Sequence, residues 1–401
     1  MSEGSRLTNA EVIALSAAHE VGVYARQPVA FVRGRGAELW DADGKRYLDF
    51  FAGLAVNNLG HCHPAVVEAV TAQAATLLHA SNVYHTLPAS ELCALLCRHS
   101  FAERVFLSNS GAEANEAAMK LARRWGSEQG GGRFEILATT GSFHGRTFAT
   151  LTATGQEKYH TGFLPLLPGI RLVPYDDLAA MEAAVRDETV AIMVEPIQGE
   201  GGVVVPAPGY LAGLRALADR RNVLLILDEI QCGLGRTGRL FAHEHAGITP
   251  DIVTLAKALG GGLPIGATCT TERVAAAFTH GAHGSTFGGN PVACAAAIAA
   301  LRALAEPELL EHVRRVGQHF RSRLEALVGR HGVREVRGMG LMLGTVLDRP
   351  GAPVVDRCRE AGLLINCTAE RVLRFLPPLI VTRAQVDDGL AILERALAAR
   401  A

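Results

Sequence analysis

The sequence has no marked excess of charge of either sign. Its 39 Lys and Arg residues are balanced by 40 Asp and Glu residues, which leaves a formal net charge of -1. Proteins that bind nucleic acid usually have a basic face, so this balance argues against a nucleic-acid partner. Anionic ligands must therefore be bound by local arginines and not by the field of the whole protein.

Paired cysteines and long apolar runs are also missing. None of the eight cysteines forms a C-x-x-C pair, which argues against a structural zinc site or a redox pair. The longest uncharged run of small residues, 288–301, contains Asn290 and Pro291 and is too short to span a bilayer. The N-terminus has acidic Glu3 and Glu11 and lacks the apolar segment of a signal peptide. We therefore expect a soluble, cytoplasmic protein without a membrane partner.

The chain does contain short apolar runs separated by helical patterns. Such nearly continuous apolar runs are typical of parallel strands that are buried on both faces of a sheet. The expected strands are 104–107, 134–138, 190–194, 223–227, 252–255 and 265–269. Polar clusters lie where most of these strands end, which is where α/β sheets bind ligands.

The pattern changes after Pro291. Helices are expected over 292–304, 308–328 and 383–399, and short strands around 340–346, 363–366 and 372–375. This pattern indicates a smaller α+β unit, with which the first fifty or so residues pack. We divide the chain into an N-terminal segment, 1–57, a large unit, 58–291, and a small unit, 292–401.

Two residues at strand ends suggest a cofactor. Lys257 follows the strand 252–255 and precedes three glycines, a position where a lysine can be desolvated enough to act as a nucleophile. Asp228 ends the strand 223–227. Enzymes that use pyridoxal 5'-phosphate (PLP) need a lysine for the Schiff base and a carboxylate that pairs with the pyridinium nitrogen. Without Asp228, Lys257 could equally be interpreted as an ordinary solvated lysine.

Two further segments fit the same cofactor. Gly111 opens a predicted helix, whose free N–H groups can bind a phosphate, although Ser110 can equally act as an ordinary helix cap. Phe143 either fills a gap in the packing or stacks on the pyridine ring.

Charged residues suggest how substrates are bound. Arg146 is either solvated or a guanidinium fork for a substrate carboxylate. Arg374 lies in an apolar strand, where an unpaired charge is unfavourable, and Glu200 is its expected partner.

Two motifs suggest other ligands, a dinucleotide and a metal ion. Residues 233–238 match the dinucleotide pattern G-x-G-x-x-G and would suggest an NAD-dependent oxidoreductase, but the strand ends several residues earlier, at Asp228, and no helix obviously begins at the glycines. His61 and His63 lack further metal ligands at a usual spacing and are interpreted as turn residues, so no metal is expected.

Six segments, 108–120, 142–147, 195–202, 227–238, 256–262 and 284–291, together resemble the class III (omega-amino-acid) aminotransferases, and within them the bacterial acetylornithine aminotransferases. The resemblance extends in the same order from Tyr24 to Arg374. It implies a fold-type I PLP-dependent transferase. Such an enzyme has a mostly parallel seven-stranded sheet in a large domain, a smaller α+β domain, and a homodimer with one PLP per subunit at the interface.

The resemblance also implies roles for individual residues. Lys257 is expected to form the Schiff base, Asp228 to hold the pyridinium nitrogen, Gln231 to contact the ring hydroxyl region, and Thr286 to reach the phosphate of the other subunit. The expected cofactor-binding residues are Gly111, Ala112, Phe143, Asp228, Glu229, Ile230, Gln231, Lys257 and Thr286. The expected substrate-binding residues are Tyr24, Arg146, Glu200, Ser285 and Arg374, with Glu200 also counted as catalytic. The sequence departs from many relatives at Ala112. The stretch 366–371 varies among acetylornithine enzymes, which leaves the acyl side of the pocket open.

The implied reaction moves the δ-amino group of N2-acetyl-L-ornithine to 2-oxoglutarate in two half-reactions, as a step of arginine biosynthesis. Succinylornithine, N-succinyl-diaminopimelate, unacylated ornithine and 4-aminobutyrate stay open as alternative amino donors.

Overall fold

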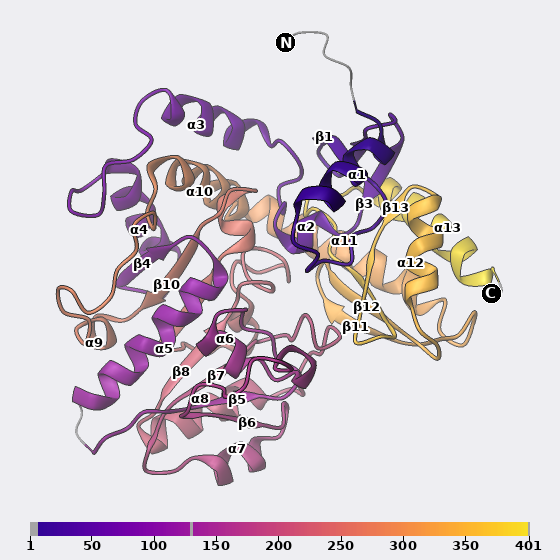
Figure 1. Cartoon of the computed structure of the whole chain (residues 1–401). Coiled ribbons are helices and arrows are strands. Elements are labelled where there is room, and N and C mark those ends of the chain that lie inside the picture. Colours follow the sequence, from indigo (N-terminus) through magenta and orange to yellow (C-terminus); the bar gives the residue numbers. More distant parts are fainter. Residues whose placement is uncertain (1–6, 129–130, 400–401) are drawn as a thin grey trace.

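The computed structural model describes residues 7–128 and 131–399. Glu3 and the outer ends of the expected first and last units, 1–6 and 400–401, lie outside the described residues. Figure 1 shows two parts side by side, one with the central strands of the sequence and the other with both ends of the chain.

The larger part is built on a seven-stranded sheet in the order β4-β10-β9-β8-β7-β5-β6. Its strands are β4 (Arg104–Ser108), β5 (Glu135–Thr139), β6 (Ile170–Val173), β7 (Thr189–Val194), β8 (Leu224–Asp228), β9 (Ile252–Leu255) and β10 (Gly266–Thr270). The pairs from β9 to β6 are parallel, whereas β10 runs antiparallel to both β4 and β9. The six strands expected from the sequence are therefore confirmed, and β6 is an additional one.

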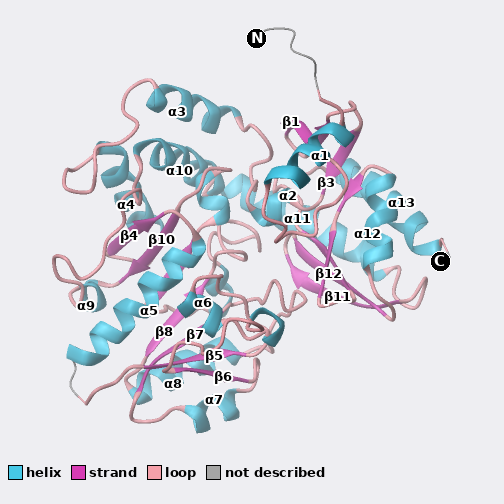
Figure 2. Ribbon diagram, in the orientation of Figure 1, coloured by secondary structure: helices cyan, strands magenta, loops and turns pink. Residues whose placement is uncertain are grey.

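The helices of the larger part are α2 (Ala52–Ala55), α3 (Pro64–Ala74), α4 (Leu87–His99), α5 (Gly111–Glu128), α6 (Phe148–Ala153), α7 (Leu178–Ala184), α8 (Tyr210–Arg221), α9 (Glu272–Ala275) and α10 (Pro291–Leu304). Most of them cover the sheet, whereas α3 packs against α10 and α2 contacts the turn Lys257–Gly260 (Figure 2). Every residue of β7 is buried, as an apolar strand covered on both faces must be. Asn290 begins α10 because its side chain accepts hydrogen bonds from the amides of Val292 and Ala293, and Pro291 suits the first helical turn.

The smaller part combines both ends of the chain. It contains α1 (Asn9–His19), β1 (Phe31–Arg35), β2 (Glu38–Asp41), β3 (Arg46–Asp49), α11 (Pro307–Glu325), β11 (Val333–Met339), β12 (Met342–Leu347), α12 (Ala352–Glu360), β13 (Leu363–Leu364), β14 (Asn366–Thr368), β15 (Val372–Phe375) and α13 (Arg383–Ala398). One sheet has the order β1-β2-β3-β13, and the other has the order β11-β12-β15-β14. Because β13 pairs with β3 in parallel, the N-terminal segment and the C-terminal unit share a sheet.

The two parts share one hydrophobic core. In the smaller part, the Phe320 ring packs against the rings of Phe50 and Phe375, and the same core includes buried residues of the large sheet. The exact unit boundaries at residues 57 and 291 stay a prediction. Within residues 7–128 and 131–399, no helix has both the length and the apolar character that a bilayer crossing needs.

Candidate active site

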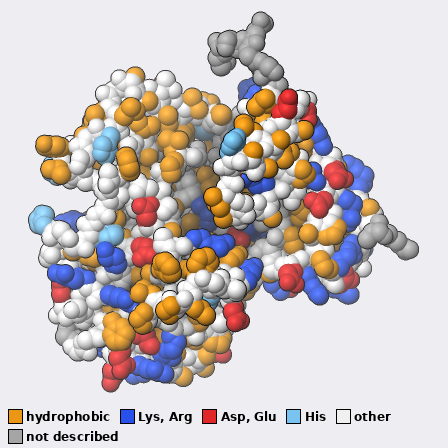
Figure 3. Space-filling view, viewed as in Figure 1, with side chains coloured by type: hydrophobic (Ala, Val, Ile, Leu, Met, Phe, Trp, Pro, Cys, Tyr) orange, Lys and Arg blue, Asp and Glu red, His pale blue; other side chains and the backbone are white. Residues whose placement is uncertain are grey.

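A cavity of about 470 Å³ lies at the carboxyl ends of the parallel strands. The segments that follow β4, β5, β7, β8 and β9 each supply part of its lining, including Gly111, Phe143, Glu200, Asp228 and Lys257. Figure 3 shows the surface hollowed between the two parts of the molecule, with Lys and Arg side chains in the hollow. Residues that are far apart in the sequence are thus brought to one place.

The start of α5 forms one wall of this cavity. The Ser110 side chain accepts a hydrogen bond from the amide of Glu113, and the Glu113 carboxylate in turn accepts bonds from Asn109 and Ser110. The amides of Gly111 and Ala112 have no acceptor among the described residues. These amides belong to the first two residues of α5, and the free amides and dipole of a helix N-terminus favour an anion. A side chain at Gly111 would press on Ile230, at 2.8 Å, so glycine keeps this wall open.

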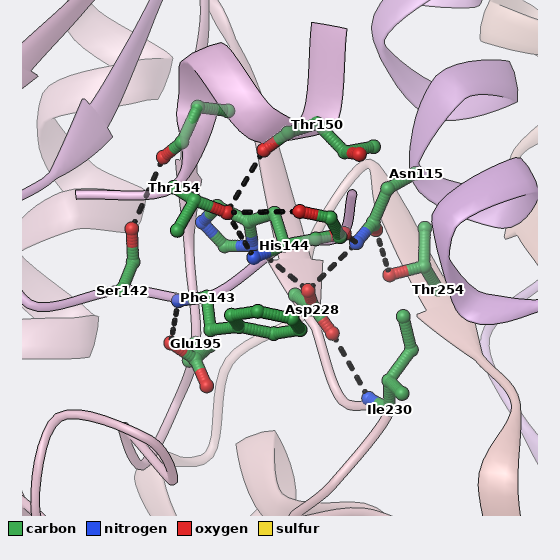
Figure 4. A network of polar contacts seen from close by, with 12 residues as sticks. Asn115, Ser142, Phe143, His144, Thr150, Thr154, Glu195, Asp228, Ile230 and Thr254 are labelled. Carbon is green, nitrogen blue, oxygen red and sulfur yellow. Dashed lines mark hydrogen bonds and ion pairs between the residues drawn. The ribbon is translucent and has the colours of Figure 1, made fainter. Parts of the chain in front are cut away.

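Asp228 is held in the cavity by three donors (Figure 4). Its Oδ2 accepts hydrogen bonds from Asn115 Nδ2 and His144 Nδ1, both at 2.8 Å, and its Oδ1 accepts one from the amide of Ile230 at 3.0 Å. Thr254 donates to Asn115 at 2.7 Å and so fixes the orientation of the amide. These hydrogen bonds fix the orientation of the Asp228 carboxylate in the cavity.

His144 and Glu195 extend this network. Burial alone would lower the pKa of His144, but the hydrogen bond and charge of Asp228 raise it. Burial raises the pKa of Glu195 to about 7, against the opposing charge of His144. The Glu195 carboxylate accepts bonds from the amides of Phe143, at 3.0 Å, and Gly199, at 3.2 Å. The sequence placed His144 and Glu195 in polar clusters at strand ends but assigned them no role, and it gave no sign of Asn115.

Lys257 lies just beyond β9, in a short 3-10 turn (Lys257–Gly260). Burial lowers the pKa of its amine, although the charges of Asp228, Glu200 and Glu195 oppose this shift. A lysine whose pKa is lowered by desolvation has more of the neutral, nucleophilic amine.

Arg374 and Glu200 form the ion pair that the sequence predicts. Arg374 Nη1 donates to Glu200 Oε1 at 2.6 Å and to Gln231 Oε1 at 3.0 Å, and Arg374 Nε donates to Asn366 at 3.1 Å. Arg374 is fully buried, while the Glu200 side chain is 18% exposed. Burial would raise the pKa of Glu200, but the charge of Arg374 holds it below its ordinary value.

Arg146 stands at the rim of the cavity. Its guanidinium lies 4.0 Å from the centre of the Tyr159 ring and 5.5 Å from that of Phe143. It forms no ion pair with a described residue. Tyr24 lines a neighbouring cavity that also includes Arg146.

Five of the expected site residues do not line the main cavity: Tyr24, Glu229, Ser285, Thr286 and Arg374. Ser285 Oγ accepts a hydrogen bond from Asn109, which lines the cavity, whereas Thr286 is exposed. The Glu229 side chain accepts hydrogen bonds from the backbone and ring of His243 and thereby holds a neighbouring loop.

The glycine segment and the histidines that suggested a dinucleotide or a metal ion have structural roles. The glycine segment 233–238 forms turns and opens no helix, and its Arg236 is buried against carbonyl groups of the smaller part. His61 bonds to Asp49 at 2.7 Å. A group of three or more His, Cys, Asp or Glu side chains suited to a metal ion does not occur among the residues that the structure describes.

Comparisons with known proteins agree with this geometry. The family model described as aminotransferase class-III matches residues 21–397. The acetylornithine aminotransferase of Methanocaldococcus jannaschii is 50% identical over 380 residues, which cover 94% of this chain and 95% of the relative.

Solved structures give the same relationship. The N-acetylornithine aminotransferase of Stenotrophomonas maltophilia is 41% identical, with a TM-score of 0.83, over 96% of this chain and 98% of the other. The ornithine aminotransferase of Toxoplasma gondii, seen with partial occupancy of PLP at its active site, is 37% identical, with a TM-score of 0.94, over 98% of this chain and 95% of the other. These matches cover nearly the whole chain, and the chain therefore belongs to the class III aminotransferases, a PLP-dependent family.

Proposed function

We propose that this chain is an acetylornithine aminotransferase, which uses PLP to transfer the δ-amino group of N2-acetyl-L-ornithine to 2-oxoglutarate. The products are N-acetyl-L-glutamate 5-semialdehyde and L-glutamate, in arginine biosynthesis. The name of a relative that is 50% identical over nearly the whole chain supports this donor. The observation that carries the proposal is the ion pair between the buried Arg374 and Glu200, which lines the same cavity as Lys257.

The residues present fit PLP. The free amides of Gly111 and Ala112 would bind its phosphate, Asp228 would hold its ring nitrogen, Phe143 would lie on its ring, and Lys257 would attach it covalently. When bound, PLP supplies an electron sink for the carbon that loses a proton.

The residues of the chain then have separate tasks. Lys257, with its lowered pKa, is the base that accepts the proton from the δ-carbon of the donor. Asn115, His144 and Ile230 all donate to Asp228 and hold its carboxylate in position for the ring nitrogen. Arg146, which has no carboxylate partner among the described residues, binds the carboxylate at the far end of the donor.

The two substrates make different demands on Arg374. Acetylornithine presents no carboxylate next to its reacting carbon, whereas glutamate does. Glu200 neutralises Arg374 while acetylornithine reacts and moves aside when the carboxylate of glutamate or 2-oxoglutarate arrives. The buried guanidinium therefore always has a partner.

Replacing each member of this pair tests the proposal. We expect Glu200→Ala to weaken the half-reaction with acetylornithine and to leave the half-reaction with glutamate intact or faster. Arg374→Ala should have the opposite effect. Single-turnover absorbance measurements with each substrate separate the two half-reactions.

The ion pair of Arg171 and Glu135, at 2.9 Å on the outer part of the sheet, supplies a control. Arg171→Ala should leave the ratio of the two half-reactions unchanged. Equal losses in both half-reactions for Glu200→Ala and Arg374→Ala would contradict the proposed exchange.

Unacylated ornithine is the second candidate donor, favoured by the TM-score of 0.94 with the ornithine aminotransferase. The higher sequence identity, 50%, lies with an acetylornithine enzyme, and we give it more weight because side chains determine donor choice within one fold. The turnover of ornithine against that of its N2-acetyl form decides between them.

We also propose that the enzyme is a cytoplasmic homodimer. Val83, Tyr84, Leu87 and Phe287 are exposed apolar side chains, and Asn82 bonds to the backbone beside Phe287, so these residues lie on one surface. Exposed apolar groups of this size are typical of protein interfaces. Thr286, in the same segment, would reach the phosphate site of the partner subunit.

A further inference from the structure

A second cavity, of about 370 Å³, adjoins the active-site cavity, and Arg146 lines both. The other residues that line this second cavity are Val23, Tyr24, Phe148, Leu151 and Phe163. We call the second cavity the acyl pocket. This volume is within the range of about 300–1,000 Å³ that is usual for sites of small molecules.

Contacts within the protein hold one wall of the acyl pocket, which is open to solvent: Val23, Tyr24, Phe148 and Phe163 are each more than half exposed. Phe148 and Leu151 lie about one turn apart on α6, so both face the same side of that helix, and Leu151 is buried at the base. His160 Nε2 contacts the carbonyl oxygens of Leu151, at 3.0 Å, and Thr154, at 2.8 Å. The amide of Phe163 donates to the carbonyl of His160, so the segment that carries Phe163 is fixed against α6.

The charges around the acyl pocket are few. Arg146 is its one lining cation and has no anionic partner among the described residues. Arg26, which lies against the Tyr24 ring, is already paired with Glu20. Lys158 lies against the Tyr159 ring and lines neither cavity. The pocket therefore offers one guanidinium at its entrance and apolar walls beyond it.

We propose that the acyl pocket binds the N2-acyl group of the donor and selects neutral, apolar acyl groups. This inference rests on the proposed function. In an N2-acylated ornithine, the acyl-amide and the α-carboxylate are attached to the same carbon. When Arg146 binds that carboxylate and the δ-amine reaches Lys257, the acyl group is left beside Phe148 and Phe163.

This arrangement discriminates between donors by charge. A succinyl group brings a second carboxylate against apolar walls, where it finds no lining cation besides the occupied Arg146. Unacylated ornithine instead brings an ammonium group close to Arg146 and leaves the apolar walls without a partner. Acetyl, propionyl and butyryl groups have neither disadvantage.

A series of donors tests the proposal, with 2-oxoglutarate as the fixed acceptor. We expect the kcat/KM values of N2-acetyl-, N2-propionyl- and N2-butyryl-ornithine to lie within about tenfold of one another. The values for N2-succinylornithine and ornithine should be lower by at least about 30-fold. A succinylornithine value equal to that of the acetyl donor would overturn the assignment.

Substitutions at Phe163 link the preference to the acyl pocket. Phe163→Arg adds a cation to the wall and should raise the ratio of succinyl to acetyl turnover by at least about tenfold. Phe163→Ala should lower kcat/KM for butyrylornithine more than for acetylornithine. Leu164→Ala is the matched control, since Leu164 is the adjacent exposed side chain and lines neither cavity.

The results distinguish a wrong proposed function from a wrong assignment of the acyl pocket. If no acylated donor reacts while ornithine does, the proposed function is wrong, and the acyl pocket with it. If acetylornithine reacts but Phe163→Arg leaves the succinyl-to-acetyl ratio unchanged, the donor stands and the pocket assignment is wrong.

Discussion

Lys257 combines two properties that are unusual for a lysine. Its amine is desolvated in the cavity, and its backbone has a φ of +41°, in the left-handed region that residues other than glycine rarely adopt. Such backbone strain concentrates at functional sites and is maintained by the surrounding structure.

Lys257→Ala should therefore abolish turnover while the protein stays folded. The covalent anchor is lost, so borohydride treatment should fix cofactor to the wild type and not to the variant. Mass measurement of the reduced, washed proteins and circular dichroism give the two readouts. Covalent cofactor on the variant would identify another lysine as the anchor.

Glu195 should make stability depend on pH. Its pKa in the folded protein is raised to about 7 from an ordinary value of 4.5. Between these values the unfolded chain loses a proton that the folded protein keeps, so stability should fall as pH rises through this window. The free energy of unfolding of the wild type, relative to Glu195→Gln, should fall by up to about 3 kcal/mol from pH 4.5 to 7.5. Unfolding curves of protein stripped of cofactor check this, and parallel pH profiles for the two proteins would refute it.

At the residue scale, the sequence predicted the pairing of Arg374 with Glu200 because a charge in an apolar strand requires a partner. The donors to Asp228 could not be predicted in the same way. Asn115 lies 113 positions from Asp228, and its approach depends on how α5 crosses the sheet. An asparagine inside a helix carries no local signal of such a contact.

At the scale of elements, the segment after β7 connects several parts of the site. Glu195 binds the amides of Phe143 and Gly199, and Glu200 follows directly. A Cβ at Gly199 would lie 2.1 Å from Gln231 Oε1, the atom that also accepts a hydrogen bond from Arg374.

Gly199→Ala should therefore impair substrate binding more than folding. The end of the Gln231 side chain can move aside, but it then loses Arg374, so kcat/KM for glutamate should fall by at least about tenfold, while stability changes by about 1–3 kcal/mol. Gly22→Ala is the control, because a Cβ there meets nothing within 4 Å. Glutamate kinetics close to those of the wild type would show that Gln231 does not position Arg374.

In the smaller part, the sequence did not predict β1, β2, β3 or β11. Strands of the large sheet were predictable where they form a continuous apolar run, as even the edge strand β4 does. The expected segments in that sheet lie within about one residue of the observed strands, apart from β6. That strand is short, lies at the edge of the sheet and contains Arg171, which pairs with Glu135, so its sequence lacks the continuous apolar run of its neighbours. The antiparallel direction of β10 leaves no trace in composition, because only its partners determine it.

At the scale of the whole molecule, the proposed dimer leads to a mixing experiment. If Thr286 acts in the partner's site, Lys257→Ala and Thr286→Asp subunits are each inactive as homodimers. A mixed dimer has one site with both native residues. Unfolding and refolding equal amounts together should restore about a quarter of wild-type activity, because about half of the dimers are mixed and each has one intact site. Mixtures that stay inactive would place Thr286 in its own subunit's site or outside both.

The pairing of β3 with β13 has a consequence for how the chain is made. Residues 46–49 leave the ribosome early, but their parallel partner, at 363–364, emerges only near the end of synthesis. Until then the nascent protein has an open strand edge, which is a template for pairing with other chains. We therefore expect premature termination before residue 363 to yield an aggregation-prone fragment and not a smaller enzyme.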